Sequence, residues 1–496
     1  MSPREATVTG RLTWSTVFAY GAPGIGAGYM GLMLSLYVMK FATDVLLIAP
    51  AVMGLIFSVS RIWDAISDPL AGYLSDRTRT SWGRRRIWLA ASILPTGFTF
   101  YMVFAPPAEL SGAALEGWMA LAIIGFYSAL TILLVPHLAL GAELSSDYHE
   151  RSRLFGMRHA FFTSGSILAL VTFYFLIRAE QEGAAQVRAL AEQLGLGAAI
   201  VMMLLILFAV VRLRERPDYQ GRVSGRPFQA FADVWRNPHA RLLIVVTFVE
   251  NIGSAAIGVL TLYVAQYVIG EPQWAPFVIL CYMVPSTLSV PLWLPLSRRF
   301  GKIRLWLFSM LLTGFAFGSV FLLLFIDSLE LKLALIMGAA VLAGLAAGCG
   351  GTVAPSIQGD VIDYDELVTG ERKEGSYFAA WNFVFKSAAG VMLLLTGFAL
   401  DLSGFVPNQP QTFTVQATIM TLYALFPLVC YAIGAWLFRH FRLDEAAHAE
   451  IRAALDARAA GASTTPTAPT AFDLDIRQAR GASSTAEAHL RGEARI

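Results

Sequence analysis

Long apolar stretches recur along this chain and restrict the folds that it can adopt. Stretches of about 20 or more mostly apolar residues follow one another from residue 16 to residue 438, with polar segments between them. A helix needs about 20 such residues to cross the roughly 30 Å hydrocarbon core of a bilayer, and it satisfies its own backbone hydrogen bonds there. The sequence therefore predicts an all-α membrane protein that crosses the cell membrane many times.

The composition agrees with this class and argues against others. The chain is 56% hydrophobic and 15% charged, whereas a soluble domain is about 25% charged. Its three cysteines lie in apolar stretches without metal-ligand spacing, and the polar residues 1–15 lead into a span too long for a signal peptide. Because we find no nucleophile with a base and no phosphate loop, we predict no enzyme activity, no cofactor other than a transported ion, and no nucleic-acid partner.

Twelve of the apolar stretches are predicted to span the membrane. They lie near residues 16–40, 51–74, 87–106, 117–140, 157–177, 194–213, 241–268, 273–296, 303–326, 331–354, 377–400 and 416–438. Arginine and lysine gather in the loops after the second, sixth and eighth spans, whereas residues 41–50, 106–116 and 401–415 contain neither. By the positive-inside rule, both termini are predicted to be cytoplasmic.

A hydrophilic loop divides these spans into two sets of six. We predict an N-terminal half at 1–213, a central cytoplasmic loop at 214–240, a C-terminal half at 241–440 and a largely disordered cytoplasmic tail at 441–496, with a short helix near 444–460. The second span ends in L-S-D-R and the eighth in L-S-R-R, which is a faint internal repeat. Two such halves are typical of the major facilitator fold, in which substrate binds between the halves.

Charged residues interrupt the second span. Arg61, Asp64 and Asp68 are spaced so that they project from one face of a helix. Each charge at the bilayer centre costs about 2.5–3.5 kcal/mol on insertion scales, so such residues line a protein interior or a cavity and usually handle ions or substrate. The alternative is a structural buried salt bridge that also includes Lys386.

The motifs around these residues resemble one transporter family. R-x-W-D-A-x-x-D-P at 61–69 and L-x-D-R-T-R-x-x-W-G-R-R-R at 74–86 are similar to the glycoside-pentoside-hexuronide:cation symporters, and further likeness occurs at 135–151, 359–366 and 381–390. The resemblance implies the major facilitator fold over about residues 15–440. It also implies cation-coupled transport of a small solute.

The same resemblance assigns the coupling site. It implies that Asp64 and Asp68 form a metal-ion site for the coupling cation, and that Ser67 and Thr131 complete the set of ligands. It also implies that Lys386 lies beside this site and couples cation binding to substrate binding. Carboxylate and hydroxyl oxygens suit a hard cation such as sodium. Without a cation the two carboxylates repel, and Lys386 or Arg61 would offset part of that repulsion.

Other residues are assigned to the gate and to substrate. A cytoplasmic gate is predicted from Asp76, Arg77, Arg84, Arg85 and Arg86, with a simple topology signal as the alternative. The candidate substrate ligands are the intramembrane carboxylate Glu250, the aromatic residues Tyr127 and Trp381 with the adjacent Asn382, and Arg158, which matches a span-five arginine of the family. Arg158 could instead anchor the helix at the membrane edge.

The sequence is compatible with two classes of substrate. In the melibiose permease, carboxylates grip the sugar at positions that correspond here to Gly28 and Leu134, which argues against a melibiose-like galactoside. Glu250 and the runs at 289–302 and 383–391 resemble a vertebrate sodium-dependent lysophosphatidylcholine symporter. We predict a symporter that transports a glycoside or sugar-derived solute and is driven by sodium rather than protons. The alternative substrate is a lysophospholipid-like amphiphile. We also predict that the protein is a monomer in contact with membrane lipid.

Overall fold

The computed structural model describes residues 12–144, 148–215, 234–370 and 374–459, and all regular structure within them is helical. The chain forms two compact units. Unit 1 comprises residues 1–227, 255–277 and 389–423, and unit 2 comprises residues 228–254, 278–388 and 424–496. Two segments from the second half of the sequence therefore belong to the same unit as the first half.

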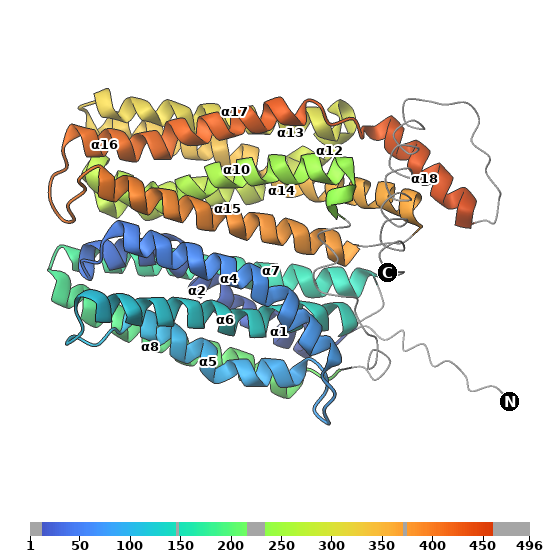
Figure 1. Ribbon diagram of the computed structural model, residues 1–496, viewed down its shortest axis with the longest axis horizontal. Coiled ribbons are helices and arrows are strands. Elements are labelled where there is room, and N and C mark those ends of the chain that lie inside the picture. Colours follow the sequence, from blue (N-terminus) through green and yellow to red (C-terminus); the bar gives the residue numbers. More distant parts are fainter. Residues whose placement is uncertain (1–11, 145–147, 216–233, 371–373, 460–496) are drawn as a thin grey trace, which may run out of the picture. The chain divides into compact units, whose positions relative to one another are not determined.

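Unit 1 is a bundle of long helices (Figure 1). It opens with the interrupted segment α1 (Trp14–Gly21), α2 (Pro23–Leu32), η1 (Met33–Tyr37), α3 (Val38–Lys40) and η2 (Phe41–Val45). It continues with α4 (Pro50–Arg77), α5 (Arg86–Phe104), α6 (Gly112–Leu144), α7 (Tyr148–Glu180) and α8 (Ala184–Arg212). The main packing pairs are α2 with α7, α5 with α6 and α8, and α4 with α6.

The second half of the sequence supplies most of unit 2 and the two extra segments of unit 1. Its helices are α10 (Pro238–Tyr263), η4 (Val264–Ile269), η5 (Pro272–Trp274), α11 (Ala275–Leu288), α12 (Val290–Phe300), α13 (Lys302–Ser319), η6 (Val320–Phe325), α14 (Leu329–Thr369), α15 (Glu374–Leu402), α16 (Phe413–Met420), η7 (Thr421–Leu425), α17 (Phe426–Phe438) and α18 (Glu445–Ala459). Within unit 2, α13 packs against α14 and α17.

Most of the helices in the described residues are long and apolar enough to cross a membrane. Ten helices or helix runs in the described residues have the length and hydropathy of a span, and an eleventh is obtained if α11 and α12, bent by 41°, are counted together. Each of the twelve predicted spans coincides with helix. The predicted second span, α4, is not among the ten, because its charged residues lower its hydropathy. Twelve spans and cytoplasmic termini remain predictions.

The predicted central loop and cytoplasmic tail lie largely outside the described residues, the tail from residue 460 onward. The short helix predicted near 444–460 is present as α18, which packs against α14. His448 of α18 lies 3.0 Å from a carboxylate oxygen of Asp363, and Ile451 is fully buried.

A close approach between α2 and α7 fixes the start of unit 1. A Cβ atom at Gly28 would lie 1.9 Å from the carbonyl oxygen of Phe162, and one at Gly165 would lie 1.9 Å from that of Ile25. Small residues allow such contacts between membrane helices. Any side chain larger than hydrogen at position 28 would therefore collide with the backbone of α7.

We expect Gly28→Ala to lower the thermal stability of the purified protein, because the added methyl group pushes α2 and α7 apart. Overpacking of this kind costs about 1–3 kcal/mol. Gly31→Ala is the matched control, since a Cβ atom there meets nothing within 4 Å. Melting followed by size-exclusion chromatography measures both variants, and equal midpoints would contradict the tight contact.

Candidate cation and substrate sites

The four predicted cation ligands lie together in unit 1. The hydroxyl oxygen of Thr131, on α6, lies 2.9 Å from one carboxylate oxygen of Asp64 and 2.9 Å from one of Asp68. The hydroxyl of Ser67 lies 3.3 Å from that of Thr131. Asp64 is buried, and Asp68 and Ser67 are half-buried.

The local sequence explains this arrangement. Asp64 and Asp68 are one helical turn apart on α4, and α4 packs along α6, which brings Thr131 between them. A single hydroxyl proton can be donated to only one carboxylate at a time. The site thus gathers two carboxylates and two hydroxyls, an all-oxygen set of the kind that hard cations prefer.

Arg61 contacts an aromatic ring one turn before Asp64. Its guanidinium carbon lies 4.3 Å from the ring centroid of Tyr127, which is cation–π geometry. The hydroxyl of Tyr127 and the Nε atom of Arg61 are buried and have no hydrogen-bond partner among the described residues. A predicted coupling residue and a predicted substrate residue therefore meet beside the cation site. Lys386 lies on α15 in unit 2, and its coupling role remains a prediction.

Three of the predicted substrate residues line a cavity in unit 2. Glu250, Trp381 and Asn382 face a space of about 480 Å³, which is in the usual range for small-molecule sites. Further polar groups in the wall come from α10, α13, α14 and α17: Thr247, Asn251, Ser254, Ser309, Gln358 and Tyr431. The Nε1 atom of Trp381 and the hydroxyl of Thr247 are buried without a hydrogen-bond partner among the described residues.

Tyr127 and Arg158 are not part of this cavity. Tyr127 belongs to α6 and contacts Arg61, and Arg158 is a half-buried residue of α7. The predicted substrate residues are thus divided, with three in unit 2 and two in unit 1.

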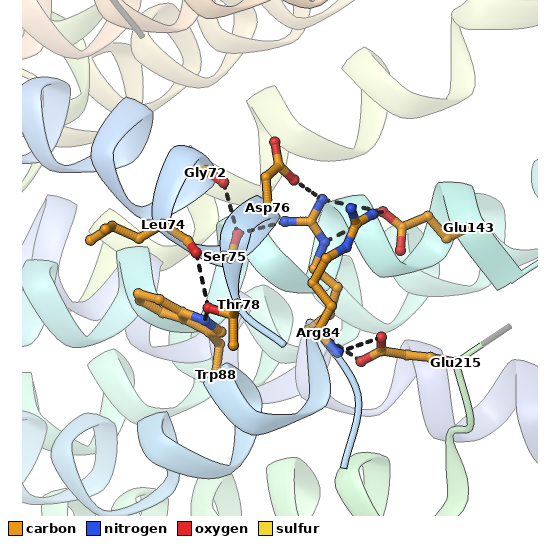
Figure 2. Close-up of polar contacts among 10 residues, drawn as sticks. Gly72, Leu74, Ser75, Asp76, Thr78, Arg84, Trp88, Glu143 and Glu215 are labelled. Atoms are coloured by element: carbon orange, nitrogen blue, oxygen red, sulfur yellow. Dashed lines mark hydrogen bonds and ion pairs between the residues drawn. The ribbon is translucent and has the colours of Figure 1, made fainter. Parts of the chain in front are cut away.

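Three of the predicted gate residues, Asp76, Arg84 and Arg85, lie at the end of α4, and Figure 2 labels Asp76 and Arg84 with their polar contacts. Arg85 donates to the carboxylate of Asp76, and Arg84 and Arg85 contact Glu143 of α6 at 2.7 Å and 3.2 Å. Both arginines are buried. This contact ties the loop before α5 to α4 and α6, so Asp76, Arg84 and Arg85 form one cluster with Glu143.

Two gate residues lie outside this cluster. Arg77 stacks on Tyr73, with its guanidinium carbon 4.1 Å from the ring centroid. Arg86 donates to the backbone carbonyl of Val210 at the end of α8, at 2.7 Å. Each therefore has a local contact of its own.

Two acidic partners of the gate arginines were not predicted from the sequence. Glu143 lies at the end of the predicted fourth span, in the motif at 135–151, so its position was a usable signal. Glu215 accepts hydrogen bonds of 2.7, 2.6 and 2.7 Å from the backbone N–H groups of Arg84, Arg85 and Arg86 (Figure 2). It caps the start of α5, where backbone donors have no partner within the helix. Because Glu215 is far from α5 along the chain, no local sequence pattern indicated this contact.

Comparison with known proteins supplies the family. Residues 19–445 match the family model described as MFS/sugar transport protein. The chain is 25% identical to the inner membrane symporter YicJ of Escherichia coli (strain K12), over 82% of this chain and 86% of that protein. It is also 25% identical to the isoprimeverose transporter of Lactiplantibacillus pentosus, over 87% of this chain and 89% of that one. The chain belongs to the glycoside-pentoside-hexuronide:cation symporter family of the major facilitator superfamily.

A solved structure agrees at the level of the fold. The crystal structure of the nucleoside transporter NupG superimposes with a TM-score of 0.64 at 13% identity, covering 86% of this chain and all of that one. This member of the symporter family is a multi-pass protein of the cell membrane. It is a transporter and not an enzyme.

Proposed function

We propose that this symporter couples the entry of sodium to the movement of a glycoside or other sugar-derived solute by alternating access. We further propose that it works as a monomer with both termini in the cytoplasm. The observation that carries the proposal is the position of Thr131, whose hydroxyl lies 2.9 Å from the carboxylates of both Asp64 and Asp68.

The charge of this group supports a cation as its ligand. Two carboxylates that share one hydroxyl repel each other when both are ionised, and a cation or a proton removes that repulsion. The hydroxyls of Ser67 and Thr131 can also act as oxygen ligands, which a metal ion needs and a proton does not. We therefore favour sodium over a proton.

Coupling to substrate is proposed to run through Arg61 and Lys386. Arg61 is one helical turn from Asp64 and stacks on Tyr127, so a change in the charge of the carboxylates acts directly on it. Lys386 takes its role from the family motif at 381–390. Binding of the cation would loosen the hold of these two basic side chains on the carboxylates and prepare the substrate site.

The cavity of unit 2 supports a solute rich in hydroxyl groups. Sugar hydroxyls need both donors and acceptors, and Glu250, Asn382 and Trp381 together supply them. The flat ring of Trp381 can also stack on the apolar face of a sugar. A lysophospholipid-like amphiphile remains the alternative substrate, and the same assay tests it.

Asp64→Asn is expected to abolish stabilisation by sodium. A ligand that binds only the folded state stabilises it by about 2.7 kcal/mol at 100 times its dissociation constant, so sodium should raise the melting midpoint of the unmodified protein by several degrees. Asp401→Asn, an exposed residue at the end of α15, is the matched control and should keep that response. Equal sodium responses in the two variants would exclude Asp64 as a ligand, and a response to pH alone would make the proton the coupling ion.

Glu250→Gln is expected to weaken binding of a glycoside while leaving sodium binding unchanged. Loss of a hydrogen bond to a charged group should reduce affinity about tenfold to a hundredfold. The shift of the melting midpoint in saturating sodium, measured with a panel of glycosides and lysolipids, reports this loss of affinity. Glu271→Gln, at a residue outside the cavity, is the control. Selective loss of sodium affinity would instead assign Glu250 to the cation, and stabilisation by lysolipid alone would favour the alternative substrate.

A further inference from the structure

A second buried group of charges lies in unit 1, far from the arginine cluster. Lys40 and Asp44 end the first helical segment, and Glu180 ends α7. The segment with Lys40 and Asp44 precedes α4, whereas the arginine cluster follows it, and the 28 residues of α4 span about 42 Å. Lys40 is fully buried and Asp44 is 3% exposed. Neither the proposed cation site nor the proposed substrate cavity uses these residues.

The charges are paired, and their carboxylates accept further hydrogen bonds. The ammonium of Lys40 contacts Glu180 and lies 3.5 Å from Asp44. Asp44 also accepts from the hydroxyls of Thr43 at 2.9 Å and Tyr267 at 2.6 Å. Charges buried in this way are tolerated only when hydrogen bonds complete the pairing. The network therefore depends on its neutral donors as well as on its ion pairs.

Several of these donors come from the second half of the sequence. Tyr267 belongs to η4, and Tyr263 at the end of α10 lies with its hydroxyl 2.8 Å from that of Thr43. The side-chain amide of Asn408, between α15 and α16, donates to the backbone carbonyl of Asp44 at 2.6 Å. All of these residues belong to unit 1. The end of one later span, and the connection between α15 and α16, are thus hydrogen-bonded to the end of the first span.

We propose that this network, which we name the Asp44 latch (Lys40, Thr43, Asp44, Glu180, Tyr263, Tyr267 and Asn408), closes the non-cytoplasmic side of the transporter. Asp44 releases Tyr267 and Asn408 whenever that side opens. The inference rests on the proposed function, because alternating access requires each side to open in turn. It adds a site of closure that the cation and substrate assignments do not contain.

The distribution of charge makes such a latch reversible. Lys40, Asp44 and Glu180 all lie on helices of the first half, so they stay paired when the later segments move away. The groups that leave Asp44 and Thr43 are neutral hydroxyls and an amide. Water can replace hydrogen bonds to neutral groups at small net cost, whereas separating a buried ion pair is expensive.

A cysteine introduced at position 258 reports whether the latch is open. A Cβ atom at Gly258 of α10 would lie 3.4 Å from a methyl carbon of Leu36 in η1, which is an ordinary contact that accepts a small side chain. A side chain at position 258 lies against Leu36 while the latch is closed. When the latch opens, the introduced thiol becomes accessible to a membrane-impermeant maleimide that is added outside whole cells. Background labelling of Cys281, Cys349 and Cys430 is measured in the protein without the introduced cysteine and is subtracted.

We expect Tyr267→Phe and Asp44→Asn, each combined with Gly258→Cys, to accelerate labelling of the introduced thiol by about tenfold. Glu192→Gln is the matched control, because Glu192 also accepts a tyrosine hydroxyl, from Tyr101 at 3.0 Å, but joins only α5 and α8 of the first half. Tyr267→Phe leaves every charge in place, so the test stands even if Asp44→Asn fails to fold.

The labelling needs no substrate, which separates the latch from the proposed function. Faster labelling in Tyr267→Phe, with no uptake of any glycoside, would support the latch and count against the substrate assignment. Labelling of Tyr267→Phe at the rate of Glu192→Gln would overturn the latch. Rapid labelling of the Gly258→Cys protein without any other change would overturn it as well.

Discussion

Asp64 and Asp68 place two carboxylates beside one threonine hydroxyl inside a helix bundle, where a charge without a partner is costly. This constraint explains much of unit 1. The carboxylates lie on the face of α4 that meets α6, because only there can Thr131 reach them. The proposed transported cation would neutralise this pair of carboxylates and would leave again during the transport cycle.

The same constraint governs both ends of α4. At its end, Arg84 and Arg85 are buried against Asp76 and Glu143. In the segment that precedes its start, Lys40 lies between two carboxylates. The helix α4 therefore carries the proposed cation site in its middle, with a charged cluster near each end. The proposed ion binding and the two proposed closures would therefore act on one continuous helix, which is the kind of contiguous element that can transmit coupling.

Local patterns in the sequence predicted much of this arrangement, and the parts that they missed depend on long-range contacts. Apolar stretches of about 20 residues located the helices, and the spacing of Asp64 and Asp68 gave their shared face. The Asp44 latch was not predicted, because Tyr267 is 223 residues from Asp44 along the chain. Glu215 was missed for the same reason. The resemblance to the family supplied Thr131, whose contact with the carboxylates no periodicity could indicate.

The measurement that tests the central claim most directly is a calorimetric titration of sodium into purified protein, with Thr131→Val beside the unmodified chain. Valine keeps the shape of threonine but removes the hydroxyl that lies 2.9 Å from both carboxylates. We predict that sodium affinity falls about tenfold or more, while Thr172→Val, whose hydroxyl donates to the backbone carbonyl of Leu168 in its own helix, leaves it unchanged. Equal sodium affinities in all three proteins would contradict a cation site between Asp64 and Asp68.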